Sequence, residues 1–516
     1  MTSPAPSARA RQSKRGVCLM LAVLSAAMTD AGADAQVPRW HPHDFVFRGP
    51  ARVTNPFAVR FEAVVKGPEG AQFVLPGFYD GGRRWALRVA PTLEGEWSLR
   101  TVSSEATLDG REITFRCVAN RNDLVRGGLR VDRERPHHFI FEDGSRCFLM
   151  GYECDWLWAL DVDDPAVPTV SAFLDNLKAH GFNMLTLNAF AYDCPWQRGR
   201  TGPDDFGPPP IFAWAESNER PDHSRMNVAY WQHYDRVVDA LYRRGIIAHI
   251  MIKVYNKMVR WPQNASPEDD LYFRWIVARY CAYPNVVWDF SKEAQNEKDV
   301  RYKVGRIRLI RTLDPYQRLV TVHDDDAAYD AGAYDGLADF RCDQQHSRWH
   351  ETLLRQRRRR AWPIVNIEFG YEHGPGGPDD KTYGVAQPPE ELCRRAWEIC
   401  MAGGYVNYYY TYTAWDVIRP SDEPPGYVYF SNLRRFFEGT RYWRLEPADD
   451  LVTRGYCLAE PGREYVVFVE GDEATELDVK APSGGLAAEW FHPLTARIRP
   501  AGTLTTGRAR LKPPEG

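Results

Sequence analysis

The stretch Val286-Val287-Trp288-Asp289-Phe290-Ser291-Lys292-Glu293 decides the fold, because a short apolar run ends there in a glutamate. A second run, Pro363-Ile364-Val365-Asn366-Ile367-Glu368, has the same form. Such runs are typical of strands that are buried on both faces of a parallel sheet. In a (β/α)8 barrel, a carboxylate at the carboxyl end of a strand points into the mouth of the barrel. We therefore expect Glu293 and Glu368 to face one cleft.

Six more apolar runs complete an alternation of strands and helices between residues 139 and 445. The eight expected strands are 147–151, 183–188, 246–252, 285–290, 319–322, 338–342, 363–367 and 404–411. The clearest helices are 227–244, where apolar residues repeat at helical spacing, and 388–403, which ends at a Gly-Gly pair. Eight such repeats predict a closed α/β barrel of the TIM type rather than an open sheet.

The chain has 516 residues, which is more than a single hydrophobic core usually holds. Short apolar runs between turn signals predict a β-sandwich over residues 36–125, followed by the barrel over 126–446. The β pattern returns over 447–516 and predicts a small C-terminal β-sandwich. Residues 1–35 have the basic start, the apolar run and the small-residue cleavage site of a signal peptide. We expect a secreted or periplasmic product.

Composition excludes several classes of function. The net charge of −4 argues against bulk nucleic-acid binding, and no segment after the signal is long and apolar enough to span a membrane. The cysteines are scattered, so they predict neither a zinc knuckle nor a disulfide framework. No P-loop, dinucleotide-binding glycine pattern or serine nucleophile elbow is present, and we expect no metal and no cofactor. The oligomeric state does not follow from the sequence.

The two glutamates and the flanking modules together resemble a known family. An acid/base glutamate on strand four and a nucleophile on strand seven is the arrangement of the clan-A retaining glycosidases. The chain resembles the apiosidase-like, family-five-like branch of that clan, and residues 77–82 with 95–101 resemble the immunoglobulin-like domain of such secreted enzymes. The resemblance implies a secreted retaining glycoside hydrolase for a polysaccharide or its side chains, with Glu293 as acid/base and Glu368 as nucleophile.

Lys292 departs from the pattern of the clan, which places an asparagine directly before the acid/base glutamate. Asn296-Glu297 would restore that pair four residues later, so Glu297 stays an alternative acid/base. We favour Glu293 because it follows the apolar strand directly, and we expect Lys292 to reach a substrate oxygen.

Polar and aromatic residues at the other strand ends are expected to bind the carbohydrate. The candidates are Asp155, Trp156, Asn188, Lys292, His323, His346, Tyr371 and Trp415. A tryptophan after strand eight is a common floor for the sugar in clan-A enzymes, which favours Trp415. The Pro- and Gly-rich segment 191–225 is expected to wall the cleft.

Two alternative functions stay open. A non-catalytic carbohydrate-binding protein on a degenerate barrel would explain Lys292. A metal-dependent hydrolase would use His323 and the acidic residues 324–326.

Overall fold

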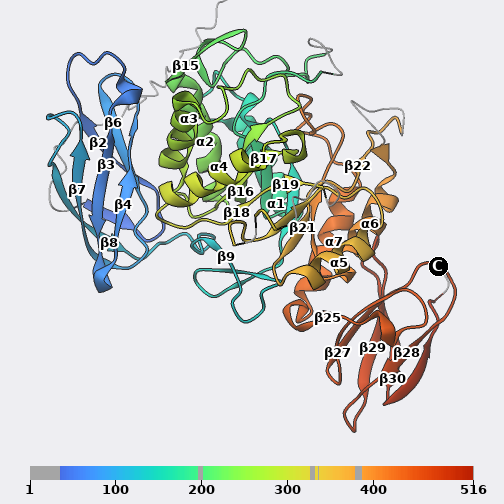
Figure 1. Ribbon diagram of the computed structural model, residues 1–516. Coiled ribbons are helices and arrows are strands. Elements are labelled where there is room, and N and C mark those ends of the chain that lie inside the picture. The colour runs from blue at the N-terminus through green and yellow to red at the C-terminus, as the bar shows by residue number, and fades with distance from the viewer. Residues whose placement is uncertain (1–34, 196–201, 326–331, 335, 378–385, 515–516) are drawn as a thin grey trace, which may run out of the picture.

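The computed structural model describes residues 35–195, 202–325, 332–334, 336–377 and 386–514. A β-rich N-terminal region, a central barrel and a C-terminal group of strands follow one another along the chain (Figure 1). The barrel lies between the two β regions, which contact different sides of it. The predicted signal peptide lies outside the described residues except for Ala35, which begins the first strand.

Eight parallel strands form the barrel. They are β12 (Met150–Glu153), β13 (Met184–Asn188), β16 (Ile247–Val254), β17 (Val286–Lys292), the pair β18 (Val320–Thr321) and β19 (His323–Asp324), β20 (Arg341–Asp343), β21 (Ile364–Asn366) and β24 (Tyr405–Tyr408). Each strand pairs with the next in chain order, and β24 pairs with β12. The fifth strand is interrupted at Val322: β18 pairs with β17, and β19 pairs with β20, which closes the circle. The predicted barrel is confirmed.

Helices follow the strands and cover the outside of the barrel. They are α1 (Pro168–Ala179), α2 (Val228–Arg243), α3 (Pro267–Tyr280), α4 (Val300–Leu313), α5 (Trp349–Arg359), α6 (Pro389–Met401) and α7 (Gly426–Glu438). In α2 the aromatic residues Tyr230, Trp231 and Tyr234 repeat at helical spacing and are buried, as the sequence predicts. Ser266 caps α3 by accepting the backbone N–H of Asp269.

Two antiparallel sheets pack together at the N-terminal side. One contains β1 (Ala35–Pro38), β8 (Glu112–Val118), β7 (Gly95–Ser103), β3 (Phe61–Lys66) and β4 (Gln72–Pro76), with β1 parallel to β8. The other contains β2 (His43–Arg48), β6 (Arg84–Val89) and β5 (Phe78–Tyr79). Phe45, Trp97 and Phe115 fill the space between them. The immunoglobulin-like assignment of this region stays a prediction.

A buried ion network joins the N-terminal sheets to the barrel. Arg279 of α3 binds Asp235 of α2 at 2.8 Å and Asp80 at 2.9 Å. Arg88 of β6 binds the same Asp235 at 3.0 Å and Asp44 of β2 at 2.7 Å. Burial opposes ionisation of Asp235, but the two guanidinium groups outweigh it and lower its pKa to about 2. This network ties the two regions together.

Smaller strands connect and extend the barrel. A small sheet before the barrel contains β9 (Leu129–Val131), β10 (Phe139–Phe141) and β11 (Arg146–Cys147). Two strand pairs lie in the loops of the barrel: β14 (Trp214–Ser217) with β15 (Arg220–Met226), and β22 (Tyr371–Glu372) with β23 (Ala386–Gln387). The C-terminal strands are β25 (Glu446–Pro447), β26 (Tyr456–Glu460), β27 (Glu464–Phe468), β28 (Thr475–Val479), β29 (Leu486–Phe491), β30 (Ile498–Leu504) and β31 (Gly507–Leu511). They rest on α6, where Trp397 stacks on Phe468.

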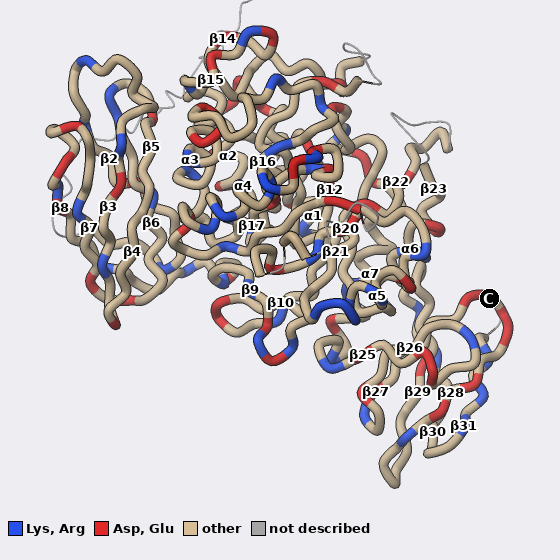
Figure 2. The backbone as a smooth tube through the Cα atoms, in the orientation of Figure 1, with Lys and Arg blue, Asp and Glu red and all other residues tan. Residues whose placement is uncertain are grey.

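Charged residues of both signs are spread over the structure (Figure 2), and the described cysteines lie inside it. Lys and Arg alternate with Asp and Glu along all three regions (Figure 2). The nine cysteines from Cys117 to Cys457 are buried and unpaired. Among the described residues, no helix has the length and apolar character needed to cross a membrane.

Candidate active site

Glu293 is the first residue after β17 and ends that strand in a left-handed turn, with φ 51° and ψ 52°. Its Oε2 accepts a hydrogen bond from Asn296 Nδ2 at 3.0 Å. The pKa of Glu293 is raised, first by burial and then by the negative charge of Glu368, while Lys257 and Lys292 act in the opposite direction. A carboxylic acid of this kind holds its proton to a higher pH than an exposed one.

Glu368 lies two residues beyond β21 and is 3 % exposed. Tyr371 donates a hydrogen bond to its Oε1. Its Oε2 has no hydrogen-bond partner among the described residues, and lies 3.8 Å from Lys292 Nζ and 3.9 Å from His323 Nε2. One carboxylate oxygen is therefore held in place while the other stays available.

Lys292 is fully buried and lies inside a cage of acceptors. Its Nζ lies 2.8 Å from Glu153 Oε1, 3.2 Å from Asp155 Oδ1 and 3.1 Å from the Tyr409 hydroxyl. Tyr409 in turn donates to Asp155 Oδ2 at 2.8 Å. Asn407 Nδ2 donates to Glu153 Oε2 at 2.6 Å. The ends of strands one, four and eight meet in this cage.

His323 connects Glu368 to the sixth strand. It is fully buried, and burial together with the Lys292 charge lowers its pKa well below the usual value, so the ring is neutral. Its Nε2 lies 3.2 Å from Gln344 Oε1, which only accepts, and therefore carries the ring proton. His346 lies on the surface and meets Gln344 Nε2 at 3.3 Å.

Aromatic side chains gather beside the glutamates. Tyr371 packs edge-on against Tyr409 at 4.7 Å between ring centroids and lies 5.4 Å from Trp415. Lys257 Nζ lies 5.9 Å from the centroid of the Trp415 ring. On the first strand's side, Trp156 stacks on Trp158 at 5.6 Å. Aromatic rings suit the flat faces of sugars, and of these rings Tyr371 and Trp415 are slightly exposed, at 7 % and 2 %, whereas Trp156, Trp158 and Tyr409 are fully buried.

The structure brings most of the predicted site residues into one connected group. Glu293, Glu368, Lys292, Asp155, His323 and Tyr371 are linked by contacts or by charge, and Asn188 Nδ2 reaches Asp155 Oδ1 at 3.5 Å. Trp156 and Trp415 are buried nearby, and His346 is the one exposed member of the predicted set. Sequence reasoning missed Glu153, Tyr409 and Lys257. Glu153 is the last residue of β12 and Asp155 lies two residues beyond it, and that spacing could have indicated that they lie close together.

The alternative residues occupy other environments. Glu297 accepts hydrogen bonds from Asn264 Nδ2 at 2.7 Å and from the backbone of Asp299 at 2.8 Å. Asp324 is bound to Arg341, and Asp326 lies outside the described residues. The described part of segment 191–225 contacts the loop after β24, where the Phe206 N–H donates to the Asp416 carbonyl at 2.7 Å.

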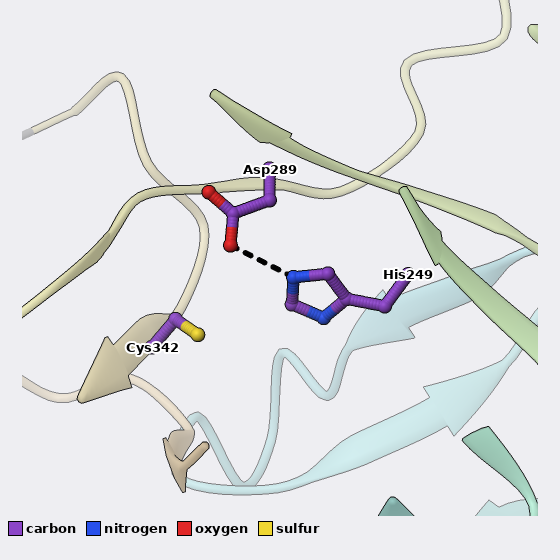
Figure 3. A group of neighbouring side chains, drawn as sticks. All are labelled: His249, Asp289 and Cys342. Carbon is purple, nitrogen blue, oxygen red and sulfur yellow. Dashed lines mark hydrogen bonds and ion pairs between the residues drawn. The ribbon is translucent and has the colours of Figure 1, made fainter. Parts of the chain in front are cut away.

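His249, Asp289 and Cys342 form a layer inside the barrel (Figure 3). One potential ligand atom of each lies within 4.8 Å of the others, and these are residue types that bind soft divalent metals. His249 Nε2 already meets Asp289 Oδ2 at 2.8 Å. Asp289 Oδ1 accepts the backbone N–H groups of Ser291 at 3.1 Å and His323 at 3.0 Å. The hydrogen bonds of Asp289 are those expected of a residue that supports the strands.

Comparisons with known proteins identify a family and a fold. The model of the family described as "Apiosidase-like, catalytic domain" matches residues 134–447, and DUF5060, a domain of unknown function, matches residues 36–104. A candidate glycoside hydrolase of Bacteroides vulgatus ATCC 8482 is 19 % identical, with a TM-score of 0.73 over 93 % of this chain and 98 % of that one. A family 5 glycoside hydrolase from the same organism is 17 % identical, with a TM-score of 0.56 over 76 % and 91 %. No curated protein is similar to the chain.

Proposed function

The chain belongs to the apiosidase-like catalytic domain family, and we propose that it is a secreted, retaining glycoside hydrolase that uses Glu293 and Glu368. Its barrel is that of a glycoside hydrolase. The family and the fold support a glycosidase, and the two glutamates give the finer mechanism.

The observation that carries the proposal is the placement of two carboxyl groups just after strands four and seven, at the same end of the barrel. The charge of Glu368 helps to raise the pKa of Glu293, which favours the acid role for Glu293 and the role of nucleophile for Glu368. Tyr371 fixes Glu368 Oε1, which leaves Oε2 as the attacking oxygen.

In the first step, Glu368 Oε2 forms a bond to the anomeric carbon while the bond from that carbon to the leaving oxygen breaks. Glu293 gives its proton to the leaving oxygen. The Glu368 charge is consumed in the glycosyl ester, which lowers the pKa of Glu293 and prepares it to act as a base. In the second step, water gives a proton to Glu293 and attacks the anomeric carbon, and the ester bond to Glu368 breaks.

The substrate is a carbohydrate, either a polysaccharide or one of its side chains. The proposed sugar contacts, all of them buried in this structure, are Trp156, Asn188, His323, Tyr371 and Trp415. Asn188 Oδ1 and His323 Nδ1 are buried without a hydrogen-bond partner in the described part of the chain, so a sugar hydroxyl would satisfy them. Export rests on the signal-like residues 1–35.

A panel of aryl glycosides and plant and microbial polysaccharides tests the proposal. We expect hydrolysis of at least one class with release of the retained anomer, followed by NMR, and covalent labelling of Glu368 by a fluorinated analogue of that sugar. Binding without turnover would favour a carbohydrate-binding protein. Turnover that a chelator abolishes and an added divalent metal restores would favour a metal-dependent hydrolase.

A further inference from the structure

Lys292 takes the position where the clan has asparagine, and the groups of the protein around it occupy all of its hydrogen-bond donors. The side chain is fully buried, and an ammonium has three N–H donors. Glu153, Asp155 and Tyr409 account for all three. The remaining neighbour, Glu368 Oε2, lies at 3.8 Å, within range of charge attraction and beyond a normal hydrogen bond.

We propose that Lys292 is a positioning residue for the reaction: its caged ammonium fixes a positive charge beside Glu368 Oε2 and orients that carboxylate toward the anomeric carbon. This inference rests on the proposed function. The cage gives the amine one position, so the charge that Glu368 meets is fixed before substrate arrives, and fixed charges of this kind need no reorganisation during reaction.

The ionisable groups of the cage shift one another's pKa values. Burial raises the pKa of Glu153 well above its usual value despite the nearby Lys292. Burial acts on Asp155 too, but Lys292 and Lys257 outweigh it and lower its pKa. For Lys292, Asp155 and Glu153 outweigh burial and raise the pKa. The carboxyl groups of the cage therefore favour the ammonium form of Lys292, and Glu368 is a further carboxyl group that faces it.

Other charged and titratable groups surround the pair. Glu293 and Glu368 both act on Lys292, Lys257 lies on the side of Asp155 and Glu293, and His323 faces Glu368 as a neutral ring. Lys292 also lowers the pKa of Glu293. Removing the ammonium must therefore affect both catalytic groups, and its effect on Glu293 has a defined sign: the pKa of Glu293 rises further.

The test is Lys292→Met, with Lys253→Met as a matched control. Lys253 is also fully buried, and its Nζ lies 2.7 Å from Asp269 Oδ1 outside the cage. Both variants lose one buried ion pair and should lose stability. With an activated aryl glycoside, we expect Lys292→Met to lower kcat by roughly 100-fold with little change in KM. In the plot of kcat against pH, the alkaline limb of Lys292→Met should move to higher pH. The alkaline limb of Lys253→Met should stay where it is in the wild type.

Each outcome decides the question. Unchanged kcat and an unchanged limb in folded Lys292→Met, or an equal shift in Lys253→Met, would make Lys292 a structural residue only. If Lys292→Met does not fold, the variant that also carries Asp155→Asn removes the ammonium together with one of its carboxylate partners, and the same pH profile is measured. Turnover by Glu368→Gln in the same assay would overturn the proposed function itself. If Glu368→Gln loses turnover but Lys292→Met keeps the kcat and the pH profile of the wild type, only this inference is overturned.

Discussion

Asp289 Oδ1 accepts the backbone N–H of His323 at 3.0 Å, at the point where the fifth barrel strand is interrupted between β18 and β19. A side chain of strand four thus makes the hydrogen bond that a continuous ladder would make through the backbone. The other oxygen of Asp289 meets His249 at 2.8 Å. Because His323 adjoins Glu368, Asp289 connects the barrel interior to the nucleophile.

Asp289→Ala should therefore be among the most damaging substitutions in the barrel. It leaves His249 Nε2 and the N–H groups of Ser291 and His323 buried without an acceptor. We expect a loss of about 3–5 kcal/mol in the free energy of unfolding. Cys342→Ala, in the same layer, removes only packing and should cost about 1 kcal/mol. Urea unfolding measures both, and equal losses would contradict the role given to Asp289.

A chelator distinguishes hydrogen bonding from metal binding in that layer. We expect the melting temperature of the wild-type protein to stay the same after dialysis against EDTA. An ion held by His249, Asp289 and Cys342 would give a different result, because bound ligands stabilise the folded state. The melting temperature of the wild type would then fall after dialysis and recover when zinc is added, and that of Cys342→Ala would not change.

The sequence predicts the barrel because each strand is a local apolar run, and it predicts Glu293 and Glu368 because they end two of those runs. It does not predict the cage, since Lys292 and Glu153 are 139 residues apart and meet only when the barrel closes. The sequence pattern predicts the first strand at 147–151, whereas the strand runs from Met150 to Glu153, because Cys147 pairs in the preceding small sheet. Local patterns find strands and their ends, while the partners of a buried charge depend on the closed fold.

The raised pKa of Glu293 has a consequence for stability. The folded state favours the protonated form, so this contribution is present at low pH and is lost as pH rises through the folded-state pKa. Glutamine cannot ionise. Glu293→Gln should therefore raise the melting temperature more at pH 8 than at pH 4. Thermal scans at pH 4 and pH 8 measure the difference. An equal increase in melting temperature at the two pH values would show that burial and Glu368 do not destabilise the ionised form of Glu293.

Asp235 should govern the attachment of the N-terminal sheets. Asp235→Asn leaves Arg88 and Arg279 buried with less countercharge, and we expect it to cost about 3–5 kcal/mol. Asp239→Asn is the matched control on the same helix. Among the ion pairs of the described chain, Asp239 pairs only with the largely exposed Arg243. We therefore expect this substitution to lower the free energy of unfolding by less than about 1 kcal/mol. Calorimetry measures both, and similar values would contradict the role of the network.

The same network predicts a response to acid. The pKa of Asp235 is lowered to about 2, so its stabilising contribution is present above the unfolded-state pKa and is lost as pH falls from about 4 toward 2. Asp235→Asn should show a shallower fall in melting temperature across this range than the wild type. A parallel fall in both proteins would place the acid-sensitive groups elsewhere.

Azide separates the roles of the two glutamates and decides between Glu293 and Glu297. Glu368→Gln keeps the size of the side chain but cannot form the glycosyl ester, so turnover should be abolished while sugar binding remains. Glu293→Gln removes the proton donor and the later base, so substrates with poor leaving groups should suffer most. Activated aryl glycosides still form the ester, and azide, which needs no base, should speed its breakdown and give a glycosyl azide of retained configuration.

Glu297→Gln should keep wild-type turnover without azide, since Glu297 is already hydrogen-bonded to Asn264 and Asp299. Rescue of Glu297→Gln in place of Glu293→Gln would move the acid/base role to Glu297.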